Sequence, residues 1–242
     1  MTTGIASGLG TTTGIALEAT VGTFQTPVTW IPHTKADFEL KKVPVVSQAL
    51  RGSRFLESTR RNVVEYTVDG ALTYDVGSKQ FGKLFQMIMG GPLVSYTALT
   101  SPAYLGSWLP GVLEGYAMSV QKGIPEITGP GTIQPFSYNG LKVTDWTLSF
   151  QRGGLLTLDL TLDGWNAATA TTYTAATYLT GASAPAMFSF NQGTLLTGGA
   201  LTINAATLST TTGTAPTAVV SSFSIKGANK YKIGRASYRE RV

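Results

Sequence analysis

Apolar and polar residues alternate along several segments of the chain, which is the pattern of a β-strand with one buried face. The alternation is clearest over Leu155–Asp163, where every second residue is a leucine and the residues between them are Thr or Asp. It recurs over residues 36–43 and 62–76. Gly70 interrupts the last of these, which predicts either a bulge or a close approach of another group to the backbone.

A hairpin and several shorter strands follow from the same pattern. Residues 141–151 alternate as well, and Arg152–Gly153–Gly154 joins them to Leu155–Asp163, which predicts a β-hairpin. The Ala/Thr/Tyr-rich residues 169–184 indicate a loop. Further strands are expected at residues 115–121, 187–191, 199–204 and 218–226.

One segment has helical rather than strand periodicity. Over residues 78–90, Ser78 is a suitable N-cap, and Gly90, Gly91 and Pro92 end the pattern. The apolar stripe, which we expect to pack into the core rather than to hold a cofactor, consists of Phe81, Leu84, Phe85 and Ile88. The chain is therefore expected to be mainly β, an antiparallel sandwich or barrel with one packed α-helix.

Composition narrows the class of protein. Hydrophobic residues make up 43% of the 242 residues, which is enough for a sizeable core, but charged residues make up only 13%. So few charges indicate a surface that is partly covered by partners. The absence of cysteine excludes disulfides and thiolate metal sites. No secretory signal and no membrane-spanning stretch is expected, so the chain is predicted to be cytoplasmic when made.

Candidate chemistry is sparse. His33 is the only histidine, and it lies between Pro32 and Thr34 without a nucleophile motif beside it. Asp159 and Asp163 share one strand face, a spacing that is typical of a solvated surface rather than of a metal site. We therefore predict no enzymatic activity, no cofactor, no metal and no small-molecule substrate.

The last ten residues, "IGRASYRERV", differ from the rest of the chain. Translation of a widely used short-read sequencing adapter gives this decapeptide, apart from Cys in place of Tyr238, and one base change explains that difference. Residues 233–242 are therefore expected to derive from adapter, with authentic sequence ending near Lys232. Without them the formal net charge falls from +5 to +3, which weakens any case for nucleic-acid binding by overall charge.

Four segments, taken in order, resemble the tail tube proteins of long-tailed, siphovirus-like bacteriophages, with a truncated C-terminus. They are "GIALEATVGTFQTPVTWIP" (14–32), "FELKKVPVVSQALRGSRF" (38–55), "VDGALTYDVGSKQFGKLFQMIMGG" (68–91) and "PFSYNGLKVTDWTLSFQRGGLLTLDLTLDGW" (135–165). No single motif is diagnostic, but their order and spacing are specific. Members of this family usually carry a further β segment after this point.

This resemblance implies a structural virion protein. Such proteins form hexameric rings in which the subunits' sheets join into one β-barrel, the rings stack into a tube, and DNA passes through its lumen. It implies residues 1–34 as an extended N-terminal arm, residues 35–232 as one β-rich domain, and a tape-measure protein and DNA as partners in the lumen. The expected location is the virion tail, after assembly in the host cytoplasm.

Two surfaces are singled out for such an assembly. The polar face that carries Asp159 and Asp163 suits a lumen or an outer wall, because a lumen through which DNA slides should avoid cations. A basic loop over residues 41–61 is expected to contact the acidic face of a neighbouring ring. Its basic residues are Lys41, Lys42, Arg51, Arg54, Arg60 and Arg61.

Two alternative functions remain open from the sequence. One is a β-sandwich adhesion or receptor-binding module of a virion. The other is a tail-terminator or capsid-decoration protein. Self-assembly of the purified chain into tubes of uniform width would distinguish the tail tube function from an adhesion module. The neighbouring genes would distinguish it from a tail-terminator or capsid-decoration protein.

Overall fold

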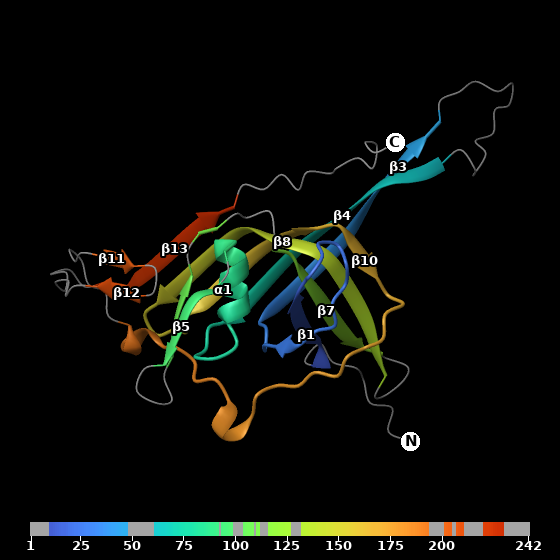
Figure 1. Ribbon diagram of the computed structural model, residues 1–242. Helices are drawn as coiled ribbons and strands as arrows, with labels where there is room; N and C mark the ends of the chain where they lie inside the picture. The colour runs from blue at the N-terminus through green and yellow to red at the C-terminus, as the bar shows by residue number, and fades with distance from the viewer. Residues whose placement is uncertain are drawn as a thin grey trace, which may run out of the picture.

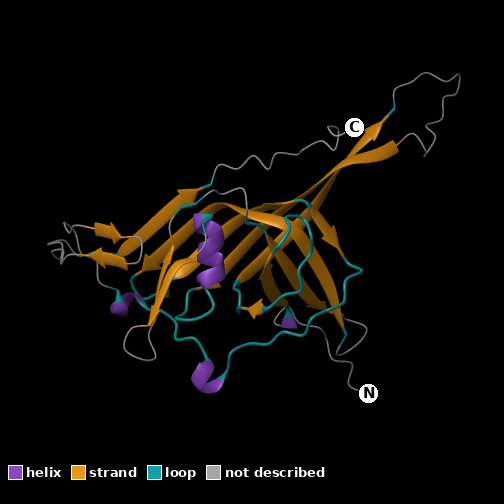
Figure 2. Ribbon diagram, viewed as in Figure 1, coloured by secondary structure: helices purple, strands orange, loops and turns teal. Residues whose placement is uncertain are grey.

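A computed structural model of the chain describes a curled, mainly β architecture with one α-helix (Figures 1 and 2). The described residues are 10–47, 61–91, 93–98, 104–108, 110–111, 116–126, 132–193, 201–204, 207–210 and 220–229. The predicted fold class, an antiparallel β fold with one packed helix, is confirmed.

The strands differ widely in length, from two residues in β2 to 19 in β8. In chain order the elements begin with β1 (Thr12–Leu17), β2 (Thr29–Trp30), β3 (Lys35–Val46), β4 (Arg61–Asp75), α1 (Gly82–Met89), β5 (Leu93–Ala98), β6 (Tyr104–Trp108) and β7 (Met118–Pro125). They continue with β8 (Ile133–Gln151), β9 (Thr157–Gly164), β10 (Asn166–Ala168), the 3-10 helices Gly181–Ser183 and Phe190–Gln192, β11 (Leu201–Asn204), β12 (Thr207–Thr210) and β13 (Ser222–Ala228).

Two antiparallel sheets share the long strand β8. Sheet 1 contains β2, β1, β7 and the first half of β8, with β10 on the other side of that half. Sheet 2 contains β13, the second half of β8, β9, β4 and β3, in that order. β5 with β6 and β11 with β12 form separate two-stranded pairs. The main sheet is therefore continuous through β8 but does not close into a barrel.

β8 changes partner at Gly140, where it passes from sheet 1 to sheet 2. Gly140 has a φ of 68°, a conformation that favours glycine. The Trp165 side chain lies against it and leaves no room for a Cβ atom. Register shifts on both sides of this point, between Met118 and Val120 and between Val143 and Asp145, add to the local bend.

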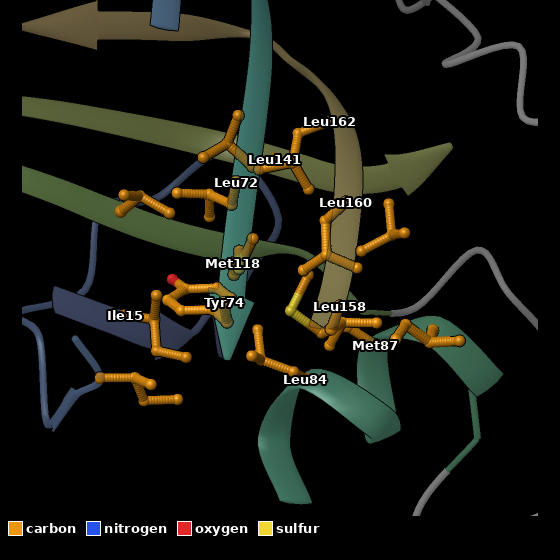
Figure 3. Packing of buried hydrophobic residues seen from close by; sticks show 14 of the residues in the cluster. Ile15, Leu72, Tyr74, Leu84, Met87, Met118, Leu141, Leu158, Leu160 and Leu162 are labelled. Carbon is orange, nitrogen blue, oxygen red and sulfur yellow. The ribbon is translucent and has the colours of Figure 1, made fainter. Parts of the chain in front are cut away.

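The core lies between the two sheets and under the helix. Figure 3 shows Leu72 and Tyr74 of β4 and Leu158, Leu160 and Leu162 of β9 packed toward the helix and sheet 1. Each of these five side chains is at most 2% exposed. The contributions from the other elements are Ile15 of β1, Met118 of β7, Leu141 of β8, and Leu84 and Met87 of α1.

The N-cap of the helix lies three residues later than the sequence predicts. Phe81 occupies the N-cap position without a side-chain hydrogen bond, whereas the Ser78 hydroxyl instead accepts the backbone N–H of Ala186 at 3.1 Å. Phe81, Leu84 and Ile88 are buried in the core. Phe85 is half-buried, with its ring centroid 5.6 Å from that of Trp108.

The hairpin of β8 and β9 is confirmed, with its turn at Arg152–Gly154. Gly70 pairs in register with both neighbouring strands, so there is no bulge. The Phe38 ring covers it instead, where a Cβ atom would lie 2.7 Å from the ring. The strand expected at residues 187–191 is wrong, because this segment makes two isolated bridges, at Met187 and Ser189, and then a 3-10 turn.

Two predicted boundaries differ from the structure. From residue 10 onward the expected N-terminal arm includes β1 and β2, which are hydrogen-bonded into sheet 1 with Ile15 and Trp30 buried. The two ends of the expected loop 41–61 belong instead to β3 and β4, because pairing of the two strands continues as far as Val46 and Arg61. Residues 48–60 and the segment 233–242 lie outside the described residues.

Candidate assembly surfaces

The outward side of sheet 2, here called the polar face, is built by alternation in five strands, which a register shift between Val143 and Asp145 of β8 interrupts once. Residues directly opposite one another in neighbouring strands share a face, so the register fixes its members. One row runs across four strands through Glu39 of β3, Asp69 of β4, Asp163 of β9 and Lys142 of β8. Three acidic side chains therefore lie next to one another on this face, from the edge strand β3 to β9.

Acidic residues outnumber basic ones on the polar face, and the remaining members are mostly Thr and Ser. Over the described strand segments 35–41, 67–75, 142–151, 157–163 and 222–228, the register gives it no Arg and no aromatic residue. The acidic members are Asp37, Glu39, Asp69, Asp75, Asp145, Asp159 and Asp163, and the basic ones are Lys35, Lys41, Lys142 and Lys226.

Two of these lysines are bound by neighbouring carboxylates. Lys35 pairs with Asp37 at 3.3 Å, and Lys41 pairs with Asp69 and with Glu39. The hydrogen bond that the Lys41 ammonium donates to Asp69, together with the negative charge of Asp69, raises the pKa of Lys41. Partial burial, with the charge of Asp69 in addition, raises the pKa of Asp163. The face therefore carries an excess of negative charge that its own lysines do not neutralise.

The outward side of sheet 1 is polar too, but the chain covers it. Residues 169–180, here called the strap, cross this side, and the buried Gln121 side chain of β7 binds them. Its carboxamide donates to Thr172 O at 3.0 Å and accepts from Thr174 N at 2.8 Å, as a neighbouring strand would. Tyr173 adds a hydroxyl contact to Thr12 Oγ1 at 3.1 Å.

A buried carboxylate fixes the bend between the sheets. Glu18, which is 6% exposed, accepts hydrogen bonds from Gly22 N at 2.6 Å, Gly140 N at 2.7 Å and Ser119 Oγ at 2.8 Å. No lysine or arginine is paired with it in the described part of the chain. These three donors replace the water that an ionised carboxylate loses on burial. Glu18 thereby ties the end of β1 to the point where β8 changes sheets.

The outer parts of β3 and β4 form an extension, here called the projecting hairpin (residues 41–46 and 61–67). β4 pairs with β9 only from Val68 onward, so beyond that point the two strands have only each other (Figure 1). Large apolar side chains on it are exposed, from 44% for Val43 to 62% for Val64. The Lys42 ammonium lies 5.8 Å from the centre of the Tyr66 ring. Exposed apolar side chains on a two-stranded ribbon indicate a surface that a partner covers.

The two edges of sheet 2 are β3 and β13, and no further strand pairs with either of them among the described residues. On the inward side of β13, Phe223 and Ile225 are 39% and 43% exposed. On the same side of β3, Phe38 and Leu40 are half-buried against the core. Each edge therefore combines unpaired backbone with apolar side chains.

His33 lies near a small cavity of about 120 Å³ that it lines together with Asp75 and Lys79. Burial, with a contribution from Lys122, lowers the pKa of His33, and its Nδ1 atom has no hydrogen-bond partner. The described residues contain no group of three or more His, Asp or Glu side chains placed to hold a metal ion. In the described part of the chain no helix is long and apolar enough to span a membrane.

The structure places the predicted site residues unevenly. Asp159 and Asp163 lie on the polar face, where Asp159 accepts a hydrogen bond from Thr73 Oγ1 at 2.7 Å. Lys41 and Lys42 belong to β3, and Arg61 is the first residue of β4. Arg51, Arg54 and Arg60 lie outside the described residues.

Sequence reasoning missed Glu18, Gln121 and the acidic neighbours Glu39 and Asp69. One signal was present: Glu18 is the only acidic residue among the first 36, in a segment of small and apolar residues. The burial of Gln121 has no local signal, because the strap that covers it is distant in sequence.

The fold and these surfaces define a structural subunit: a β-sandwich with an acid-rich face, a projecting hairpin and, among the described residues, no strand paired to either edge of sheet 2. Comparison with known families is consistent with this class. The sequence profile of the phage tail tube proteins matches residues 8–241, and the chain belongs to this family. No curated protein matches the chain. The match includes residues 233–241, whose origin in adapter sequence stays a prediction.

Proposed function

We propose that this chain polymerises as stacked hexameric rings into the phage tail tube, and that the polar face of sheet 2 lines the lumen through which DNA passes. Membership of the family makes the chain a structural component of the virion tail that assembles into a tube. The hexameric ring rests on the resemblance of the sequence to such tubes. The observation that carries the lumen assignment is the acid-rich composition of the polar face.

The electrostatics of the polar face favour passage of DNA. Duplex DNA carries about one negative charge per 1.7 Å of its axis, and every free cation that contacts a phosphate adds affinity. Lys35 and Lys41 are held by carboxylates of the same face, and the strand segments that form this face contribute no Arg to it. A lumen lined by this face would repel the phosphates, so DNA and a tape-measure protein would move through it without tight binding.

Joining of sheet 2 across subunits would use its two edges. All neighbouring strands are antiparallel, so β13 and β3, four steps apart, run in the same direction. Rotation about a ring axis would pair them in parallel. Phe223 and Ile225 would then continue the apolar side of Phe38 and Leu40, and Lys226 would approach the acidic side of β3. Such pairing leaves no exposed edge in sheet 2.

The projecting hairpin is the proposed contact between rings. Its exposed valines and Tyr66 supply apolar area, and Lys42 and Arg61 supply positive charge beside it, whereas Lys41 is held by Asp69 and Glu39. With Arg51, Arg54 and Arg60 from the connecting segment, we expect it to contact the acidic side of a neighbouring ring. The protein would then act only as a structural element, without catalysis, assembling in the host cytoplasm before the tail is complete.

Electron microscopy of the purified chain tests the tube directly. We expect tubes of uniform width, and a monodisperse monomer that binds glycans would instead favour an adhesion module. The double variant Arg54→Glu with Arg61→Glu should give shorter tubes in lower yield. Unchanged tube length and yield in that variant would count against the hairpin as the contact between rings.

Retention of DNA by assembled tubes tests the lumen assignment. Asp159→Lys with Thr161→Lys places two cations on the polar face, and tubes of this variant should retain short duplex DNA at low salt and release it as salt rises. Glu126→Lys, in the β7–β8 hairpin of sheet 1, is the matched control and should retain none. Equal retention by both variants would show that the polar face is not in the lumen.

A further inference from the structure

Lys122 reaches from sheet 1 to the edge strand of sheet 2. It lies in β7 on the same side as the buried Met118 and Val120, so its side chain points between the sheets. Its ammonium donates a hydrogen bond to the main-chain carbonyl of Ala36 in β3, at 2.5 Å. This cation is half-buried and is held by backbone rather than by a carboxylate.

The contact falls on the part of β3 that is best suited to pair with another strand. From Lys35 to Val43 the register with β4 is unbroken, and the first irregularity comes only at Pro44. A long, regular edge strand is a template for unwanted pairing, and lysine at such an edge is one of the means by which proteins prevent it. The segment beyond Val43 already has a bulge and a proline, whereas the segment around Ala36 has Lys122.

An alternative position for the ammonium lies next to its present one. Lys122 lines an open groove of about 370 Å³ together with Asp37, Glu39 and Asp69. A cation that leaves the Ala36 carbonyl therefore meets carboxylates in the same groove, so its release does not leave an unpaired buried charge. Lys35 and Lys41 already bind these carboxylates, so a displaced Lys122 would share them.

We propose that Lys122 guards the β3 edge of the unassembled subunit, and that a strand of a second copy displaces it into the acidic groove when the ring closes. This inference rests on the proposed function, because it assumes that β3 pairs between subunits. Its consequence is kinetic: free subunits do not pair through β3 until a growing ring supplies a strand in the correct register.

Assembly kinetics of Lys122→Met test this guard. Methionine keeps an unbranched apolar stem and removes the charge and the donors. We expect a lag several-fold shorter than that of the wild type, and a lower threshold concentration, measured by light scattering with electron microscopy of the products. Lys79→Met is the matched control, because the Lys79 ammonium also donates to a main-chain carbonyl, Ser183 O at 3.1 Å, away from β3. Its lag should equal that of the wild type.

The outcomes distinguish a failure of the proposed role of Lys122 from a failure of the proposed tube function. A folded Lys122→Met protein whose lag equals or exceeds that of the wild type would overturn the guard and leave the tube function intact. Wild-type protein that is folded but forms no tubes would overturn the function itself. Lys122→Gln, whose side chain is too short to reach Ala36 O, serves as the second variant if Lys122→Met does not fold. It should shorten the lag in the same direction, and an unchanged lag would contradict the guard.

Discussion

The two sheets of this molecule both have a polar outward side, but the described part of the chain covers only one of them. On sheet 1 the strap binds Gln121 and leaves Ser119, Gln121 and Ser137 at most 3% exposed. On sheet 2 no described segment crosses the corresponding side, and it carries charges where sheet 1 carries amides and hydroxyls. The same alternation of polar residues therefore produces a buried polar layer in sheet 1 and an exposed polar face in sheet 2. The difference comes from the strap that crosses sheet 1 rather than from the strands themselves.

Removal of a carboxylate should affect the two sheets very differently. Glu18→Ala leaves the N–H groups of Gly22 and Gly140 and the Ser119 hydroxyl without their acceptor, and we expect a loss of about 3–5 kcal/mol in the free energy of unfolding. Glu39→Ala on the polar face is the control, with a change within about 0.5 kcal/mol. Urea denaturation followed by tryptophan fluorescence measures both. Equal losses of unfolding free energy in the two variants would show that the covered side of sheet 1 and the polar face of sheet 2 do not differ in this respect.

Loss of the Gln121 side chain should loosen the strap without unfolding the sandwich. Gln121→Ala removes the hydrogen bonds to Thr172, Thr174 and Ser137, and we expect a destabilisation of about 2–3 kcal/mol. Amide hydrogen exchange should become faster at Thr174, because its N–H loses its acceptor. Gln151→Ala, at the exposed end of β8, should leave exchange in the strap unchanged. Slow exchange at Thr174 in Gln121→Ala would show that the strap does not depend on this residue.

The smallest effect is expected on the polar face and depends on pH. The pKa of Asp163 is raised above its ordinary value of 3.8, so the folded state binds more protons than the unfolded state just above that pH. Stability should therefore decrease as pH rises through this range, and Asp163→Asn should remove the decrease. Because the group is partly solvated, we expect a gain of only a fraction of a kcal/mol, less than about 1, at neutral pH.

Denaturation of the wild type and of Asp163→Asn across the acidic range measures this difference. Asp145→Asn, on the same face, serves as the control for the loss of a surface charge. If the free energy of unfolding of Asp163→Asn still decreases as pH rises, the pH dependence comes from other groups.

The sequence predicted the parts of the fold whose two faces have different environments. β9 was clear because Leu158, Leu160 and Leu162 face the core while Thr and Asp residues between them face outward. β1 was not, because its residues are buried from both sides by the core and by neighbouring loops, so no alternation appears. The helix start was misplaced because Ser78 binds the N–H of Ala186, 108 positions away, rather than the helix.

Some residues of the candidate surfaces could likewise be predicted from the sequence, and others could not. Asp159 and Asp163 follow from alternation within one strand, which is local information. Their grouping with Glu39 and Asp69 requires the register of β3, β4 and β9, which pairs residues nearly a hundred positions apart. The contact of Lys122 with Ala36 depends on how the two sheets face each other, which no short-range pattern records.

The continuity of β8 has a mechanical consequence. A single covalent strand passes from sheet 1 into sheet 2, and at the crossing it is fixed by the Glu18 contact to Gly140 N and by the Trp165 ring. Rotation of one sheet relative to the other would therefore have to deform the shared strand, which makes the two sheets a single mechanical unit. A filament built from such subunits would bend at the contacts between them, while each subunit moved as a stiff block.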